Sequence, residues 1–408
     1  MNKKKNIIVI GGGASGFFAA INLVLLKPDY HITILEKTNK LLSKVKVSGG
    51  GRCNVTHYCF DNSELVKNYP RGNKELRQVL PRFDVKSTID WFEKQGVKLK
   101  AEEDGRMFPV TDSSQTIIDC FLKLANKLNI EIVTQCEVFS IKKHDRFKLK
   151  TSKTEFIADA VICSIGGHNK VDAYHLIKNL GHTIVEPVPS LFTINLPNGS
   201  IKKELQGISV PSAEVKIACS KLKYHGPVLI THWGLSGPAV LKLSAFAAHE
   251  FYDSGYNATI LVNWIFPHKI NEAEVEIKNF QKEKHKALPF TSPLFGLPKR
   301  LWEFLCNKSG IDNSRPWAEI SNKQINSLSE NLSNGSFKME GKTTFKEEFV
   351  SCGGVDLREV DFKTMQSKLI PGLYFCGEVL NIDGITGGFN FQNAWSTAWI
   401  CANALAEG

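Results

Sequence analysis

No apolar run in the sequence is long enough to cross a membrane, since a spanning helix needs about 20 apolar residues in succession. An export signal is also missing. Lys3, Lys4 and Lys5 resemble the charged start of a signal peptide, but the apolar run 6–10 that follows is cut short by three glycines. We therefore expect a cytoplasmic protein with no membrane-bound part.

Metal-binding patterns are absent as well. The ten cysteines are scattered, with no Cys-x-x-Cys pair and no His/Cys group at zinc-finger spacing. We expect no metal site, and reduced thiols, because cytoplasmic proteins seldom hold disulfides. The chain also lacks repeats and low-complexity tracts. Its 42% hydrophobic and 23% charged residues exclude a disordered or collagen-like protein.

An excess of positive charge is confined to the first quarter of the chain. The whole sequence has 51 Lys and Arg against 41 Asp and Glu, a net charge of +10, and residues 1–100 hold 18 basic and 8 acidic side chains. The rest of the chain is therefore balanced. This distribution favours a local anionic partner over a generally cationic protein.

The N-terminus has the pattern of a dinucleotide-binding βαβ unit. A β-branched strand over 6–10 leads into Gly-x-Gly-x-x-Gly, a helix over 17–26, a second strand over 31–35 and an acid twenty positions after the last glycine. Free N–H groups at the helix start suit a pyrophosphate, and the acid suits ribose hydroxyls. A glycine turn used only for packing is the alternative. The expected contacts are Gly11, Gly13, Ala14, Ser15, Gly16, Glu36 and Lys37.

Later segments continue an α/β pattern. Asp112, Ser113 and Ser114 are placed to cap a helix. Strands are expected over 130–134, 138–142 and 147–151, with a buried return strand over 160–165 that ends in glycines. Such a meander and return strand are typical of flavin-binding Rossmann domains. A late strand from Leu373 and a closing helix over 393–406 indicate that the chain leaves this domain and comes back.

Three further motifs resemble the BaiN/RdsA (YhiN-like) family of bacterial flavoproteins. They are the loop KVKVSGGGRCNVT at 44–56, the segment CGEVLNIDG at 376–384 and the string TGGFNFQNAWS at 386–396. The resemblance covers nearly the whole chain. This sequence has Leu42 and Ser43 where the family usually has a glycine and a basic residue, Lys46 where members tend to be apolar, and His57 where Asn is usual.

The resemblance implies FAD and an α/β fold built from a discontinuous Rossmann-type FAD-binding domain. An inserted β-rich, barrel-like domain and a small helical domain complete the expected fold. The expected boundaries are 1–190 and 350–408 for the FAD domain, 191–268 and 334–349 for the β-rich domain, and 269–333 for the helical domain.

The motifs also suggest which residues surround the flavin. The glycines of the first loop are expected to form a backbone nest, with Arg52 as an anion partner, and an acid after the late strand suits the ribityl chain. A glycine pair before the closing helix would let N–H groups stabilise negative charge on reduced flavin. The expected contacts are Lys44, Ser48, Gly49, Gly50, Gly51, Arg52, Cys53, Asn54, Gly166, Gly377, Glu378, Asp383, Gly387, Gly388, Phe389 and Asn390. Cys53 and Cys376 are candidate proton donors, with buried, inert thiols as the alternative.

The hydride donor and the substrate follow less directly from the sequence. No second Gly-x-Gly-x-x-Gly fingerprint occurs, so NAD(P)H is expected to visit without a Rossmann domain of its own. RdsA-like members are associated with reduction of uridine to dihydrouridine in ribosomal RNA. A helix between Pro70 and Pro81 would present basic residues for RNA phosphates, with a solvated basic face as the alternative. The candidates are Lys67, Arg71, Lys74, Arg77 and Arg82.

We therefore expect an FAD-dependent oxidoreductase that reduces the C5–C6 double bond of a uracil in ribosomal RNA. The flipped-out base would stack against the flavin, near Trp233, Phe389 or Trp395. One alternative is a flavoenzyme acting on a small enone, a steroid-like molecule or an amine. Another is a non-catalytic, flavin-binding protein associated with RNA or the ribosome.

Overall fold

The computed structural model describes residues 4–197, 199, 201, 203–343 and 350–408, which form two compact units. Unit 1 comprises 1–189 and 346–408, and unit 2 comprises 190–345. The first boundary lies next to the predicted one. The last six residues of the predicted β-rich domain, 344–349, lie outside the described residues.

Unit 1 is built on a seven-stranded sheet in the order β20-β21-β22-β10-β1-β2-β6. Its parallel part pairs the first strand with strands from far along the chain, for example Ile8 with Val161, which in turn pairs with Leu373. β-branched residues buried on both faces explain why these short strands lie centrally. The strands are β1 (Asn6–Ile10), β2 (His31–Leu35), β6 (Glu131–Val133), β10 (Ala160–Cys163), β20 (Val360–Asp361), β21 (Gln366–Ser367) and β22 (Leu373–Phe375).

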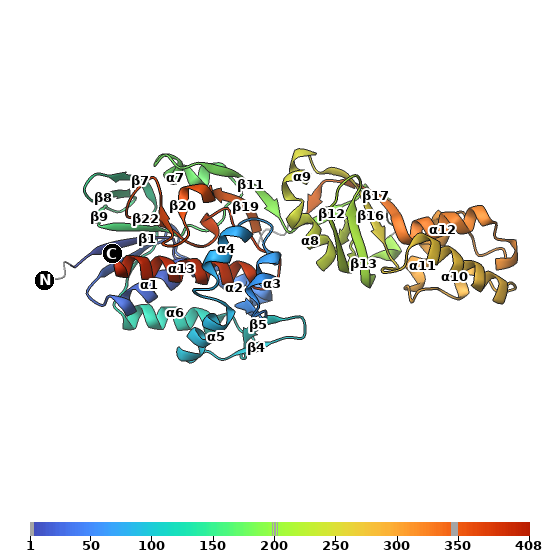
Figure 1. Ribbon diagram of the computed structural model, residues 1–408, viewed down its shortest axis with the longest axis horizontal. Helices are drawn as coiled ribbons and strands as arrows, with labels where there is room; N and C mark the ends of the chain where they lie inside the picture. Colours follow the sequence, from blue (N-terminus) through green and yellow to red (C-terminus); the bar gives the residue numbers. More distant parts are fainter. Residues whose placement is uncertain (1–3, 198, 200, 202, 344–349) are drawn as a thin grey trace. The chain divides into compact units, whose positions relative to one another are not determined.

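Two helices from opposite ends of the chain pack against each other in unit 1, α1 (Ala14–Leu26) and α13 (Phe389–Glu407) (Figure 1). The closing helix starts four residues earlier than predicted, directly after the glycine pair. The other helices of unit 1 are α2 (Ser43–Gly51), α3 (Asn62–Leu65), α4 (Asn73–Val79), α5 (Val85–Lys94), α6 (Gln115–Lys127) and α7 (His175–Lys178). The cap predicted for the helix after Asp112 is only partly right, because Ser114 is the N-cap but its side chain makes no capping hydrogen bond.

Three small sheets complete unit 1. Two strands of the predicted meander are observed as β7 (Val138–Lys143) and β8 (Phe147–Thr151), and they form a sheet with a strand that was not predicted, β9 (Glu155–Ala158). The strand predicted over 130–134 is β6, which belongs to the seven-stranded sheet instead. A second sheet joins β3 (Thr56–His57), β4 (Leu99–Ala101) and β5 (Arg106–Pro109), and a two-stranded sheet joins β11 (Ile184–Ser190) to β19 (Val350–Val355).

Unit 2 contains an antiparallel sheet in the order β17-β16-β13-β14-β15-β12-β18. Only Gly341 separates β17 from β18, yet these two strands pair with β16 and β12 near opposite ends of that order. The short connection therefore brings the two ends of the sheet together, as a barrel requires. The strands are β12 (Thr193–Asn195), β13 (Ser209–Ile217), β14 (Lys223–Ile230), β15 (Gly234–Ser236), β16 (Asn257–Asn263), β17 (Gly335–Glu340) and β18 (Lys342–Thr343).

The predicted helical domain shares a buried apolar cluster with this barrel. Trp302 and Leu328 from the helices belong to the same cluster as Val215 and Val262 from the strands. The structure thus groups the two predicted insertions in one unit. The helices of unit 2 are α8 (Pro238–Phe246) and α9 (Ala248–Asp253), which lie within the predicted β-rich domain, and α10 (Ile270–Glu283), α11 (Lys299–Lys308) and α12 (Asn322–Asn334), which lie in the predicted helical domain.

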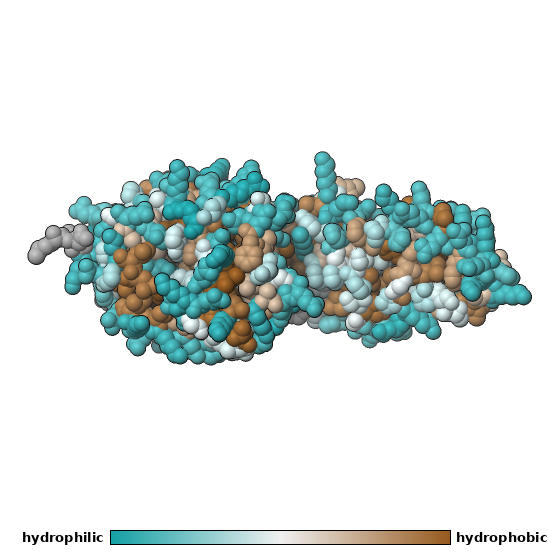
Figure 2. Space-filling view, turned by 60° about the horizontal axis from the view of Figure 1, so that its bottom comes forward, coloured by the Kyte–Doolittle hydropathy of each residue, from teal (hydrophilic) through white to brown (hydrophobic). Residues whose placement is uncertain are grey.

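The face shown in Figure 2 carries mainly hydrophilic residues, with scattered apolar ones. Among the described residues, no helix is long and apolar enough to cross a membrane.

A buried imidazole in unit 1 makes the stability of the fold depend on pH. His182 Nδ1 donates to Glu359 Oε2 at 2.9 Å, and its Nε2 accepts from Ser367 Oγ at 2.9 Å. Burial lowers the pKa of His182, against the opposing effect of Glu359. The stabilisation is therefore complete above about pH 6.5, the usual pKa of histidine, and is lost as the pH falls through the lower folded-state value.

We expect wild-type protein to lose more thermal stability between pH 7.5 and pH 5 than the variant His182→Gln, whose side chain does not titrate. Thermal unfolding at both pH values measures the difference. Equal losses in the two proteins would contradict this role for His182.

Candidate functional site

The three glycines of the N-terminal loop have different structural roles. Gly11 has φ +112°, and a Cβ there would lie 2.4 Å from the carbonyl oxygen of Ser164. A Cβ at Gly16 would lie 2.1 Å from the carbonyl oxygen of Gly11, so this glycine lets α1 pack onto the turn. At Gly13 a Cβ would meet nothing within 4 Å. The open space lies where the fingerprint brings a pyrophosphate close to the backbone.

The start of α1 offers uncapped N–H groups to an anion. The N-cap residue Gly13 provides no side-chain hydrogen bond, and the first turn has no acidic residue. Glu36 lies beside this turn, where its Oε2 accepts from Gly12 N at 2.9 Å and its Oε1 accepts from Thr38 N at 2.8 Å. Free N–H groups, an open approach and a fixed carboxylate fit the pyrophosphate and ribose of FAD.

Gly377, just after β22, lies against the first turn of α1. A Cβ at Gly377 (φ +78°) would lie 2.4 Å from Ser15 Oγ, so the two loops touch. Lys44 Nζ donates to Glu378 Oε2 at 2.6 Å and to the carbonyl oxygen of Gly167 at 3.3 Å. Two predicted cofactor contacts, Lys44 and Glu378, are therefore ion-paired to each other at the edge of the site.

Charges of both signs lie near Gly166, from Lys37, Lys44 and Glu378. Gly166 has φ +79° and open space at its Cβ position. Burial lowers the pKa of the neighbouring His168, and the nearby charges of Lys37 and Lys44 lower it further. Lys44 is paired with Glu378, so Lys37 is the lysine near this open glycine turn that suits a phosphate-bearing ligand.

The glycines of the 48–54 loop lie in the left-handed region, as a glycine-specific turn requires. Gly49, Gly50 and Gly51 have φ of 57°, 66° and 84°, and the last two have open space at their Cβ positions. Ser48 Oγ donates within the chain, to the carbonyl oxygen of Val45 at 3.0 Å. The loop therefore leaves room for a ligand above its central glycines.

Arg52 has two carboxylate neighbours within the protein. Its Nη1 donates to Glu102 Oε1 at 2.5 Å and lies 3.6 Å from Asp112 Oδ1, and its guanidinium stacks over the Phe108 ring. The hydrogen bond and charge of Glu102 raise the pKa of Arg52. Two carboxylates thus contact this cation within the protein, and its contact with an anionic group of the cofactor stays a prediction.

The start of α13 forms the third side of the site. Its N-cap is Gly388, which makes no side-chain cap, and a Cβ there would lie 2.4 Å from the carbonyl oxygen of Thr56. Below it, Gln392 Oε1 accepts from Thr56 Oγ1 at 2.6 Å and from Thr88 Oγ1 at 3.0 Å, in a buried setting. These contacts fix the helix end, and with it a second set of uncapped N–H groups.

The side chains of Asp383 and Asn390 fix the segment around Gly384 by hydrogen bonds. Arg71 Nε donates to Asp383 Oδ1 at 2.6 Å, and a second guanidinium nitrogen of Arg71 bonds the other carboxylate oxygen. The Asn390 side chain bonds both backbone groups of Gly384, at 2.7 and 3.0 Å. Asp383 is 1% exposed. Both side chains therefore make contacts within the protein, and their contacts with the cofactor stay predictions.

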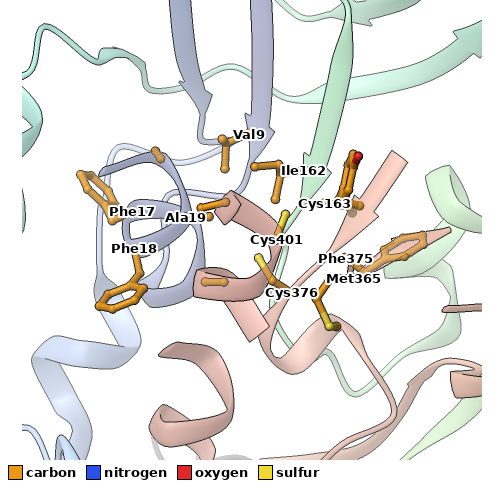
Figure 3. Close-up of a cluster of buried hydrophobic side chains, with 14 of the residues drawn as sticks. Val9, Phe17, Phe18, Ala19, Ile162, Cys163, Met365, Phe375, Cys376 and Cys401 are labelled. Carbon is orange, nitrogen blue, oxygen red and sulfur yellow. The ribbon is translucent and has the colours of Figure 1, made fainter. Parts of the chain in front are cut away.

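Cys53 and Cys376 are too deeply buried to donate protons to a substrate. Both are 0% exposed, and burial raises both thiol pKa values, that of Cys53 to about 12. Figure 3 shows Cys376 among apolar side chains, near Cys401 and Met365. A bound cofactor can only bury them further, so we correct the prediction in favour of inert thiols.

Alkylation tests this correction. Burial raises the pKa of the Cys53 thiol to about 12, so little of the reactive thiolate forms at pH 8. In folded protein we expect iodoacetamide to label the exposed Cys219 and to spare Cys53 and Cys376 until denaturant is added. Mass spectrometry of the peptides gives the result. Native labelling of Cys53 as fast as Cys219 would restore it as a candidate.

The proposed stacking surfaces are only partly available. Trp395 is fully buried, and its Nε1 donates to the carbonyl oxygen of Val55, so it belongs to the core. Phe389 is also buried, beneath the ring of His57. Trp233, in unit 2, is exposed.

Three ring-bearing residues at the end of β3 and directly after it were not singled out as site residues from the sequence. His57 stacks on Phe389 with ring centroids 4.6 Å apart, and its Nδ1 lies 3.0 Å from the carbonyl oxygen of Gly387. Tyr58 and Phe60 form an exposed edge-to-face pair with centroids 4.6 Å apart, and they are 56% and 48% exposed. Alternating aromatic residues directly after a flavin-loop motif are the signal that points to them.

The predicted basic face is reduced to two residues. Arg71 lies before α4 and is tied to Asp383, with its side chain 15% exposed, so it is not part of the face. Lys67 is paired with Glu64 at 2.5 Å, and Arg82 donates to the carbonyl oxygen of Lys363. Lys74 and Arg77 are exposed on α4, and no ion pair within the described parts of the chain involves them.

Known proteins match this chain over nearly its whole length. The ribosomal RNA dihydrouridine synthase of Haemophilus influenzae is 28% identical, and the match covers 100% of this chain and 100% of the relative. The enzyme of the same name from Escherichia coli is 29% identical, with 98% of this chain and 97% of the relative covered. The 3-dehydro-bile acid delta(4,6)-reductase of Clostridium scindens is 28% identical, with 98% of each chain covered.

Solved structures share the fold. The 3-ketosteroid delta1-dehydrogenase of Sterolibacterium denitrificans has a TM-score of 0.51 at 11% identity, with 99% of both chains covered. The 3-ketosteroid-delta4-(5alpha)-dehydrogenase of Rhodococcus jostii has a TM-score of 0.50 at 12% identity, with 98% of this chain and 97% of that chain covered.

The predicted family, the α/β Rossmann-type fold class and FAD as cofactor are confirmed. Residues 5–404 match the model of the HI0933-like protein Rossmann domain. The chain belongs to this family, and it is an FAD-dependent oxidoreductase.

Proposed function

We propose that this protein reduces the C5–C6 double bond of a uracil in ribosomal RNA, with NAD(P)H as the hydride donor and the cytoplasm as its location. The full-length similarity to two ribosomal RNA dihydrouridine synthases carries the proposal. The exposed rings of Tyr58 and Phe60 support it, because they follow the flavin loop directly and rings of this kind stack on unpaired bases.

Bound FAD supplies the hydride chemistry in this proposal. The start of α1 and Glu36 would hold the pyrophosphate and ribose, and the open glycines at 13, 50 and 51 would give the cofactor access to the backbone. The uncapped start of α13 favours negative charge near Gly388, which stabilises the reduced state. NAD(P)H then binds only for the transfer step.

Removing the two unpaired cations of α4 should weaken RNA binding. We expect Lys74→Ala with Arg77→Ala to lower affinity for a ribosomal RNA fragment. The slope of log K against log salt should fall by roughly 1.4, from about 0.7 per contact with single-stranded phosphates. Lys86→Ala is the matched control, because Lys86 is exposed but paired with Asp90 at 2.6 Å. Equal effects in both variants would contradict an RNA contact on α4.

Reoxidation of the reduced enzyme tests the reaction. Protein reduced anaerobically with NADPH should be reoxidised by ribosomal RNA that lacks the modification, and dihydrouridine should appear in equal amount. A flavin that NADPH does not reduce would overturn the proposal in favour of a non-catalytic RNA-associated protein.

A reductase of small enones is the second candidate, favoured by the full-length similarity to the bile acid reductase of Clostridium scindens. Reoxidation by a conjugated ketosteroid and not by RNA would support it. Substrate binding would then be insensitive to salt and to the α4 variants.

A further inference from the structure

His57 joins two of the cofactor loops through one hydrogen bond and one ring contact. It lies on β3, where it pairs with Arg106, and its Nδ1 lies 3.0 Å from the carbonyl oxygen of Gly387. A carbonyl oxygen only accepts, so Nδ1 carries the hydrogen and Nε2 is the site of any further proton. The ring stacks on Phe389 at an interplanar angle of 26°.

His57 lies so close to Gly387 that the Gly387–Gly388 turn has no room for a side chain at position 387. Gly387 has φ +129°, and a Cβ there would lie 3.2 Å from His57 Nδ1 and 2.8 Å from the Phe389 ring. On the other side of the imidazole, a Cβ at Gly105 would lie 2.6 Å from Nε2. The imidazole is therefore wedged between the β4–β5 hairpin and the start of α13.

Few other charges surround this imidazole. Asp104 and Arg106 face it from the β4–β5 hairpin with opposite signs, and the first turn of α13 has no acidic residue. The buried Tyr69 hydroxyl donates to the carbonyl oxygen of Phe389 at 2.7 Å, and burial raises its pKa, so it stays neutral. Burial lowers the pKa of His57 in the protein without a charged ligand. A proton gained at Nε2 would thus change the charge beside Gly387.

We propose that His57 is a positioning residue that fixes the Gly387–Gly388 turn for the flavin and takes up a proton when the bound FAD is reduced. The inference rests on the proposed function for its placement of the flavin beside this turn. A hydride equivalent, which is two electrons and one proton, would pass from the reductant to FAD and add one negative charge, and one further proton would pass from solvent to His57 Nε2, where it would balance that charge.

Two variants separate the two roles of His57. Asparagine carries its amide N–H at the δ position, as histidine does, so His57→Asn keeps the bond to Gly387 but does not titrate. His57→Phe keeps the ring stack and loses the bond. We expect FAD to dissociate from His57→Phe with a Kd about five- to tenfold higher than from wild type, and His57→Asn to restore wild-type affinity.

The midpoint potential of bound FAD, measured against pH by spectroelectrochemistry without substrate, tests the proton uptake. Over roughly pH 5–7, the range in which histidine titrates, the reduction equilibrium of wild type should change by up to an extra tenfold per pH unit compared with His57→Asn. For a two-electron couple this is about 30 mV per pH unit.

If the midpoint potentials of wild type and His57→Asn change with pH at the same slope, the proposed proton uptake is wrong. If His57→Phe binds FAD as tightly as wild type, the proposed positioning of the Gly387–Gly388 turn by His57 is wrong. If His57→Phe does not fold, His57→Gln serves instead, since its amide lies one bond too far out for Gly387. Wild-type protein that binds FAD but does not reduce RNA would overturn the proposed function alone, because the potential is measured without RNA.

Discussion

Replacing Gly13 with aspartate should abolish FAD binding and leave the fold intact. The backbone at Gly13 is extended (φ −95°, ψ −171°), and a side chain there meets nothing within 4 Å. Aspartate is a favoured N-cap, so its carboxylate would bond the free N–H groups of α1. The same carboxylate would occupy and repel the pyrophosphate site. We expect the Kd for FAD to rise at least about 100-fold, or about 3 kcal/mol, as measured by flavin fluorescence.

Gly16→Ala is the contrasting control for this experiment. Its Cβ would lie 2.1 Å from the Gly11 carbonyl oxygen and 2.7 Å from Ser164 Oγ, so the helix has to move and thermal stability should fall. Gly13→Asp should keep wild-type far-UV circular dichroism and Tm in the absence of FAD. Gly13→Asp that purifies with a full complement of FAD would show that the pyrophosphate lies elsewhere.

Replacing Arg71 with methionine should destabilise unit 1 strongly. The change removes two hydrogen bonds from Asp383, a carboxylate that is 1% exposed. Breaking a buried ion pair costs about 3–5 kcal/mol, because the remaining charge is poorly solvated. Urea unfolding followed by circular dichroism measures this loss.

Lys74→Met is the matched control for Arg71. Its side chain is exposed on α4, so stability should change by less than about 0.5 kcal/mol. If Arg71→Met instead kept wild-type stability and weakened RNA binding as Lys74→Met does, Arg71 would return to the predicted RNA-binding face.

The fingerprint at the N-terminus could be predicted because all of its determinants are local. Strand, glycine spacing, helix and acid lie within 36 residues, and each glycine has the steric role that its position implies. The resemblance in the later motifs extended this to the closing helix, where the glycine pair adjoins Thr56 across the sequence.

Charge pairing over long distances could not be predicted in the same way. Arg52 and Arg71 look like free cations in the sequence, but their carboxylate partners are 50 and 312 positions away. Burial of Cys53 and Cys376 depends on packing that involves both ends of the chain. The corrections therefore concern residues whose roles are decided by distant segments.

The structure shows the surroundings of two residues that depart from the usual pattern of the family, Leu42 and His57. Leu42, found where the family usually has glycine, has a left-handed backbone (φ 54°) and is fully buried. A non-glycine residue in this conformation costs about 1–2 kcal/mol, which burial of the leucine side chain offsets. His57, another of the departures, lies at the contact between two of the expected cofactor loops, through its bond to Gly387.

The dihydrouridine content of ribosomal RNA tests the central claim most directly. Ribosomal RNA from a strain that lacks this protein, and from the same strain carrying wild-type or Gly13→Asp protein, would be digested and its nucleosides measured by mass spectrometry. We predict that one or more dihydrouridines are lost in the deletion strain, return with wild-type protein and do not return with Gly13→Asp. Identical dihydrouridine content in all three strains would contradict the proposed reaction.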